Sequence, residues 1–310
     1  MTIFDAHLHL FSRRYFEAVA AASPLPGTVA ERIDRLAKTM AIEIPGPDLG
    51  AHVRRWLADL DRHGVERAVA FASAPEEADA VAEAARLAGG RFVPVALVNP
   101  KAAGTKDRGR DLLATKGFRG ILLFPALHQY RLQGPEAAEV VREAANHGAV
   151  VYVQCGLLKV PVRDALGFPR VVDLSFANPL DLVPLASSLP GTTFLVPHFG
   201  AGFFREALLL CAQCENVVLD TSSSNSWIVT EPAGLSLPDV VMRALAVTGP
   251  TRLLFGTDSA TFPRGFRGDL LEAQREAIRA CGATPADRDL ILGGNAERIF
   301  SAATPRAVAQ

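Results

Sequence analysis

Two histidines near the start of the chain stand two positions apart, in the run Phe4-Asp5-Ala6-His7-Leu8-His9. Side chains two positions apart on a strand point to the same side, so His7 and His9 can bind one ion together. Neutral imidazole suits zinc and other divalent transition metals, and catalytic sites usually keep three protein ligands and an open position. The pair predicts part of a metal site, although two buried histidines satisfied by backbone or carboxylate groups would look the same.

Two further polar residues follow apolar runs and could complete such a site. Asp258 comes after Leu253–Thr257, and a buried carboxylate needs a partner because leaving it unpaired is costly. Asp258 could bind the metal, or accept a proton from a water that the ion activates, unless it only caps a helix. His198 follows a strand-like run and precedes a glycine-rich turn, so it could polarise a substrate carbonyl, shuttle a proton or be purely structural.

Three other side chains are candidates for contacting the substrate. Gln154 ends an apolar run, and because its amide is a weak neutral ligand at best, we expect it to hydrogen-bond to substrate or water. Arginines near predicted strand ends, above all Arg205 and Arg264, could hold a substrate carboxylate in a bidentate pair. Most loop arginines are simply solvated, so this role stays open for both.

Apolar, β-branched runs recur along the chain, and amphipathic, often alanine-rich stretches lie between them. The predicted strands are Thr2–His9, Glu66–Ala72, Phe92–Val98, Gly120–Pro125, Val150–Gln154, Thr193–His198, Val217–Ser222 and Leu253–Asp258. The predicted helices are Ala30–Met40, Glu76–Ala88, Arg108–Thr115, Pro135–His147, Leu180–Ser188, Gly202–Cys211, Pro238–Val247 and Asp269–Ala280. Strands buried on both faces suit an α/β fold, the (β/α)8 TIM barrel, with a doubly wound open sheet as the alternative.

The position of the polar residues favours the closed barrel, because a barrel brings the carboxyl ends of all its strands to one catalytic end. The candidate site residues lie at such ends: His7, His9, Gln154, His198 and Asp258. We expect residues 1–310 to form one domain. A proline-bounded insertion at about residues 23–49 would cover the barrel mouth or contact a partner subunit in a homodimer.

Composition limits the partners that the chain can have. Lys and Arg total 32 against 33 Asp and Glu, so no charge excess suggests binding to nucleic acid or to a membrane surface. No apolar run reaches the roughly 18 to 20 residues of a membrane span. Four cysteines are too few for a disulfide framework in this chain. We therefore expect a cytoplasmic protein that acts on a small molecule.

Four sequence segments together resemble the amidohydrolase superfamily, specifically the amidohydrolase-2 group that includes aminocarboxymuconate-semialdehyde decarboxylase. They are FDAHLHLF, VPHFGAGFF, LLFGTDS and the closing GGNAERIF, and the resemblance covers nearly the whole chain. It implies that His7 and His9 are metal ligands, that Asp258 is a metal ligand or acid-base group, and that His198 is the catalytic histidine. The implied cofactor is one divalent ion, for which zinc is the first choice.

One departure from the family pattern concerns the fifth strand, which normally ends in a metal-binding histidine. The run VVYVQCG places Gln154 there, so the metal could bind weakly, differ or be absent. The leading hypothesis is a mononuclear metal-dependent hydrolase of an amide, ester or lactone. A non-oxidative decarboxylase of a carboxylated aromatic or muconate-like acid is the alternative, and a non-catalytic ligand-binding barrel is the second alternative.

Overall fold

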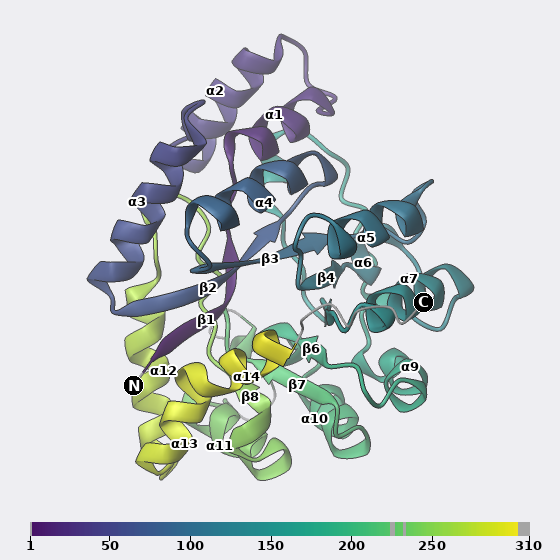
Figure 1. Cartoon of the computed structure of the whole chain (residues 1–310), viewed down its shortest axis with the longest axis vertical. Coiled ribbons are helices and arrows are strands. Elements are labelled where there is room, and N and C mark those ends of the chain that lie inside the picture. The colour runs from purple at the N-terminus through teal and green to yellow at the C-terminus, as the bar shows by residue number, and fades with distance from the viewer. Residues whose placement is uncertain (1, 224–226, 232–233, 303–310) are drawn as a thin grey trace.

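The computed structural model describes residues 2–223, 227–231 and 234–302. Eight parallel strands neighbour one another in chain order, and helices surround them (Figure 1). The strands are β1 (Ile3–His9), β2 (Val65–Ala72), β3 (Phe92–Leu97), β4 (Gly120–Leu123), β5 (Val150–Val153), β6 (Phe194–Val196), β7 (Val217–Asp220) and β8 (Leu253–Leu254). The predicted (β/α)8 barrel is confirmed.

Helices fill the connections between these strands. The α-helices are α1 (Arg13–Ala21), α2 (Val29–Met40), α3 (Leu49–Arg62), α4 (Ala78–Leu87), α5 (Thr105–Ala114), α6 (Pro125–His128), α7 (Pro135–Asn146), α8 (Pro161–Ala165), α9 (Val183–Ser188), α10 (Phe204–Gln213), α11 (Leu237–Thr248), α12 (Gly268–Ala280), α13 (Pro285–Asp289) and α14 (Asn295–Ala302). The sequence patterns placed most of the long helices to within a few residues, but α1 and α3 were not predicted. No helix of the described residues is long and apolar enough to cross a membrane.

The barrel closes between its last and first strands. β8 itself has only two residues, but the segment after it continues beside β1. The amide of Ala6 donates to the Phe255 carbonyl over 2.9 Å, and the Asp258 amide donates to the His7 carbonyl over 2.8 Å. The predicted strand through Asp258 was therefore too long as a regular strand, yet its end does lie beside the end of β1.

Apolar side chains pack on both sides of the barrel wall. One cluster fills the inside of the barrel, where Phe4 of β1 and Tyr152 of β5 contact Phe300 of α14. The helix α14, yellow in Figure 1, thereby covers the amino-terminal end of the barrel. The larger cluster lies between the strands and the outer helices. A filled interior of this kind leaves the carboxyl ends of the strands as the open end of the barrel.

A shift in strand register aims the first two histidines. Ala6 belongs to the cluster inside the barrel, whereas Leu8, two positions later, packs in the layer beneath the helices. Side chains two apart on a regular strand share a face, so the alternation must break between them. The pairing of β1 with β2 shifts register between Asp5 and Leu8. Such a bulge turns His7 and His9 toward the barrel axis.

The proline-bounded segment 23–49 contains α2. This helix packs against α1, which follows β1, and against α8, which follows β5. Leu36 of α2 shares a buried cluster with Phe16 of α1 and Leu166, just after α8. The segment therefore lies over connections that leave the carboxyl ends of the strands. Its predicted contact with a partner subunit stays a prediction.

Gly156 should be the glycine on which the open end of the barrel depends most. Its φ is +66°, and a Cβ there would stand 2.2 Å from the backbone oxygens of Gly200 and Ala201. We expect Gly156→Ala to lower the free energy of unfolding by about 2 to 5 kcal/mol, because left-handed backbone and overpacking costs add. Urea unfolding measures this change.

Gly64 provides the matched control for that substitution. Its φ is also +66°, but no atom lies within 4 Å of the Cβ position. Gly64→Ala should therefore cost only the backbone penalty of about 1 to 2 kcal/mol. Equal losses of stability in the two variants would show that the close approach of Gly156 to the backbone of Gly200 and Ala201 does not exclude a side chain.

Candidate active site

His7 is the most buried imidazole of the site and has a fixed orientation. It is 2% exposed, and its Nδ1 lies 3.0 Å from Asp220 Oδ2 at the end of β7. A carboxylate only accepts hydrogen bonds, so Nδ1 carries the hydrogen and Nε2 keeps its lone pair. Burial lowers the pKa of His7, although the charge of Asp220 opposes the shift. A neutral imidazole in this orientation is suited to binding a metal ion.

His9 faces the same point from farther out on β1. Its Nδ1 lies 2.7 Å from Ser73 Oγ, and its Nε2 lies 3.4 Å from Asp258 Oδ1. The Nε2 of His7 is 3.7 Å from the same carboxylate oxygen. The ligand atoms of these three residues all lie within 4.8 Å of one another. The structure thus brings together the three residues that the sequence predicted as metal ligands.

Asp258 supplies the negative charge of this group. Its side chain is 31% exposed, and its backbone has a φ of +60°, which is uncommon for a residue other than glycine. Burial opposes its ionisation, but the hydrogen bond from the His9 side chain and the nearby imidazoles of His7 and His198 prevail. The pKa of Asp258 is therefore held well below its usual range. Strained backbone of this kind is often found at active sites.

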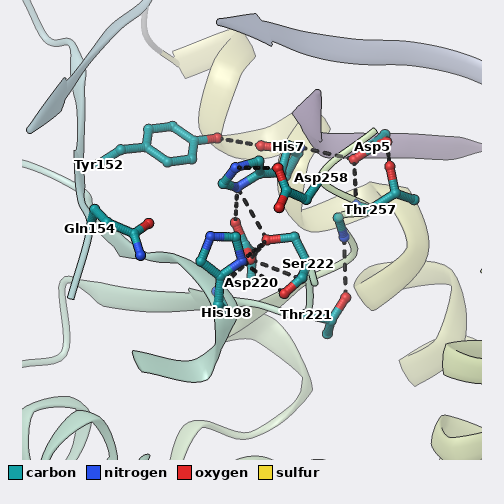
Figure 2. Close-up of polar contacts among 12 residues, drawn as sticks. Asp5, His7, Tyr152, Gln154, His198, Asp220, Thr221, Ser222, Thr257 and Asp258 are labelled. Carbon is teal, nitrogen blue, oxygen red and sulfur yellow. Dashed lines mark hydrogen bonds and ion pairs between the residues drawn. The ribbon is translucent and has the colours of Figure 1, made fainter. Parts of the chain in front are cut away.

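His198 lies beside His7, in the turn after β6 (Figure 2). The two ring centres of His7 and His198 are 4.8 Å apart. The Nδ1 of His198 donates to the Ser222 carbonyl oxygen over 2.9 Å, so its Nε2 is free to accept a proton. The backbone amide of His198 donates to Asp220 Oδ1 over 2.9 Å. Asp220 therefore holds both histidines.

Gln154 lies just after β5, on the same side of the site as His198 (Figure 2). It is 3% exposed, and its amide nitrogen donates to the Cys155 carbonyl over 3.1 Å. The amide oxygen is then the atom that is left to accept a hydrogen bond or to approach an ion. Beside it, the Tyr152 hydroxyl donates to the Ala6 carbonyl over 2.8 Å, which ties β5 to β1 across the barrel.

The two predicted substrate-binding arginines differ in position. Arg264 follows β8, and its guanidinium is close enough to Asp258 for their charges to interact. Within the described residues, no carboxylate lies within ion-pair distance of Arg264. Arg205, on α10, has a side chain that is 83% exposed and lies 4.0 Å from Glu206, its neighbour in the chain. The structure does not bring Arg205 into contact with the other candidates, and its role stays a prediction.

Three side chains of the site were missed by the sequence analysis: Asp220, Ser222 and Ser73. Asp220 had a usable signal, because it directly follows the buried apolar run Val217–Leu219, as Asp258 follows another. The serines had none, since serine is common at strand ends. Asp5, in the same run as the two histidines, accepts hydrogen bonds from the His7 amide and from the Thr257 amide.

The sequence matches the family model for amidohydrolases over residues 4–302. The chain therefore belongs to the amidohydrolase family. Among curated proteins, no sequence gives a significant match.

Several solved structures have the same fold as this chain. The structure of 5-carboxyvanillate decarboxylase LigW from Sphingomonas paucimobilis has a TM-score of 0.66 at 13% identity, covering 97% of this chain and 99% of that one. A dihydroxybenzoic acid decarboxylase from Polaromonas sp. JS666, with bound manganese and the inhibitor 2-nitroresorcinol, has a TM-score of 0.62 at 16% identity, covering 97% of each chain. An amidohydrolase from Burkholderia multivorans with bound zinc has a TM-score of 0.59 at 18% identity, covering 97% of this chain and 99% of that one.

We expect Asp220→Asn to weaken metal binding without unfolding the protein. An asparagine amide facing His7 Nδ1 would move the imidazole hydrogen to Nε2, the atom that must be free for the ion. Loss of such an orienting partner typically costs about 10- to 100-fold in metal affinity. Competition with a chromogenic chelator measures the dissociation constant. Asp34→Asn, at an exposed position on α2, is the control, and equal affinities in the two variants would contradict the prediction.

Proposed function

We propose that this chain is a metal-dependent hydrolase of a small-molecule amide, ester or lactone, with the ion bound by His7, His9 and Asp258. One observation carries the proposal: the two Nε2 atoms and Asp258 Oδ1 converge at the open end of the barrel, each imidazole held by a partner on its Nδ1. This donor set of two imidazoles and one carboxylate is that of many catalytic zinc sites.

The spacing of these atoms supports a shared ion. Two ligand atoms about 2.1 Å from one ion, at a tetrahedral angle, would lie about 3.4 Å apart. The separations from Asp258 Oδ1 are 3.4 Å to His9 and 3.7 Å to His7. The local charge supports it too, because two carboxylates, Asp258 and Asp220, adjoin an imidazole whose pKa is lowered by burial. A divalent cation would balance them, and zinc is our first choice.

When bound, the ion would supply Lewis-acid activation of water and of a substrate carbonyl. The chain's own groups then handle the protons. Asp258 is held as a carboxylate and can accept a proton from the attacking water. His198 can take up or deliver a proton at Nε2, because its Nδ1 is committed to the Ser222 carbonyl. The Asp220 carboxylate accepts hydrogen bonds from His7 Nδ1 and from the His198 backbone amide, which keeps both residues in position.

The substrate would be held by groups around this centre. Gln154 presents its amide oxygen as an acceptor, since its amide nitrogen is used by backbone carbonyls. Arg264 provides a positive charge near Asp258 and could pair with a substrate carboxylate. These two positions favour a small polar substrate that carries an acidic group.

Non-oxidative decarboxylation is the second candidate function. The cation of Arg264 near Asp258 would suit a carboxylated aromatic acid, and two of the similar structures are decarboxylases of such acids. Hydrolysis ranks first because the ionised Asp258 lies beside the proposed ion, where its carboxylate can accept a proton of water, whereas replacing a carboxyl group on carbon requires a proton donor. Release of carbon dioxide from such acids would reverse this ranking.

The purified protein should contain about one divalent ion per chain, as expected for a mononuclear catalytic site. His7→Ala and His9→Ala should each lose the ion, because two ligands are too few to retain it. Elemental analysis after gentle purification measures the metal content. His147→Ala, at the end of α7, is the control. Wild-type protein without metal, with an activity that chelators do not change, would contradict the proposal.

Asp258→Asn should lower kcat for ester or lactone hydrolysis by about 100- to 10,000-fold, the usual contribution of a general base. The amide cannot accept the proton of water, although its size is unchanged. Steady-state assays with a panel of esters and lactones measure this loss, with Asp34→Asn as control.

The outcomes of these assays separate the candidate functions. Unchanged turnover in Asp258→Asn would exclude the proposed role of this carboxylate. A wild-type protein that binds ligands of the panel but converts none of them would favour a non-catalytic binding barrel instead.

A further inference from the structure

The two histidines of β1 are held by different kinds of partner. The Nδ1 of His7 faces a buried carboxylate, that of Asp220, at 3.0 Å. The Nδ1 of His9 faces a hydroxyl, Ser73 Oγ, at 2.7 Å. Ser73 comes directly after β2, the strand that pairs with β1, so its position follows from the register of the two strands.

Ser73 is itself fixed by a buried carboxylate. Its backbone amide donates to Glu77 Oε2 over 2.8 Å, and the Ser12 amide donates to the other oxygen of Glu77 over 2.6 Å. Glu77 is completely buried, and no cation forms an ion pair with it in the described part of the chain. An unpaired buried carboxylate is costly, so these two amide bonds must be retained. Glu77 thereby ties the segment after β2 to the segment after β1.

We propose that Ser73 is a positioning residue for His9: its hydroxyl holds Nδ1 so that Nε2 points to Asp258 and can bind the ion, while Glu77 fixes Ser73. The inference rests on the proposed metal site. Asp220 performs the same task for His7, but a carboxylate only accepts, whereas a hydroxyl can accept or donate. The ring of His9 is therefore held in the metal-binding tautomer less firmly than that of His7.

Stacking supports the ring of His9 without choosing its tautomer. Phe11 stacks on it with the ring centres 5.0 Å apart, and Phe71 lies on another side at 5.2 Å. Apolar rings fix the plane of the imidazole, but they do not distinguish its two nitrogens. Ser73 is the polar group at Nδ1, and Asp258 is the polar group at Nε2.

The test compares Ser73→Ala with Ser73→Thr and with Ser175→Ala, a change at an exposed position. In the chain stripped of metal and titrated with zinc against a chelator, Ser73→Ala should bind about 10- to 100-fold more weakly. Ser73→Thr should restore most of the affinity because it keeps the hydroxyl, and thermal unfolding should show that all three variants fold. Equal zinc affinity in Ser73→Ala and wild type would overturn the proposal.

A second measurement does not depend on the metal. In the metal-free protein at pH 8, nitrogen-15 NMR of the imidazoles should show the His9 Nδ1 signal shifted in Ser73→Ala relative to the wild type, because the hydrogen bond between Nδ1 and the hydroxyl is lost. The His9 signal is assigned by its loss in His9→Asn. An unchanged Nδ1 signal in Ser73→Ala would overturn the role of Ser73. If the wild type binds no zinc, the proposed function fails, and this spectrum still decides the role of Ser73.

Discussion

The site depends on the seam where the segment after β8 joins β1. Asp258 reaches the two imidazoles because its amide donates to the His7 carbonyl over 2.8 Å, and the His9 amide donates to the Ser259 carbonyl over 2.8 Å. Asp5 is buried at this seam and accepts bonds from the His7 amide and the Thr257 amide. Asp5, a buried carboxyl group that needs hydrogen-bond donors, thus joins the end of β1 to the segment after β8. The positions of the three proposed ligands follow from this closure of the barrel.

Further hydrogen bonds connect the three histidines of the site to neighbouring strand ends at the open end of the barrel. The Nδ1 of each imidazole binds a group from another strand end. His7 binds Asp220 at the end of β7, His9 binds Ser73 after β2, and His198 binds the Ser222 carbonyl, which also follows β7. All three Nε2 atoms are consequently left for chemistry. These partners are themselves fixed by further hydrogen bonds, such as those from the Ser73 amide to Glu77 and from the Ser222 amide to Asp220. The site is therefore organised before a substrate binds, as efficient catalysis requires.

Much of the fold could be predicted from the sequence, because buried parallel strands are nearly continuous apolar runs and most helices begin or end at proline or glycine. The residues at strand ends were predictable for the same reason, and His7, His9 and Asp258 do meet. The register shift in β1 was not, since it depends on pairing with β2 and leaves no mark in local composition. Arg205 shows that closeness to a strand end in the sequence does not by itself place a side chain in the site. Its side chain is 83% exposed and lies beside Glu206.

Gln154 stands where the resemblance to the amidohydrolase-2 group implies a third histidine, and backbone carbonyls fix its side chain. Its amide nitrogen is bound to the carbonyls of Cys155 and Leu157, so the side chain is fixed with its oxygen available. A neutral amide oxygen binds a transition metal more weakly than imidazole does. The three proposed ligands therefore all come from the seam between β1 and β8. In the proposed function, the positions near β5 and β6, with Gln154 and His198, are then left for the substrate. The proposed ion ligands and the proposed substrate contacts would thus come from different parts of the barrel mouth.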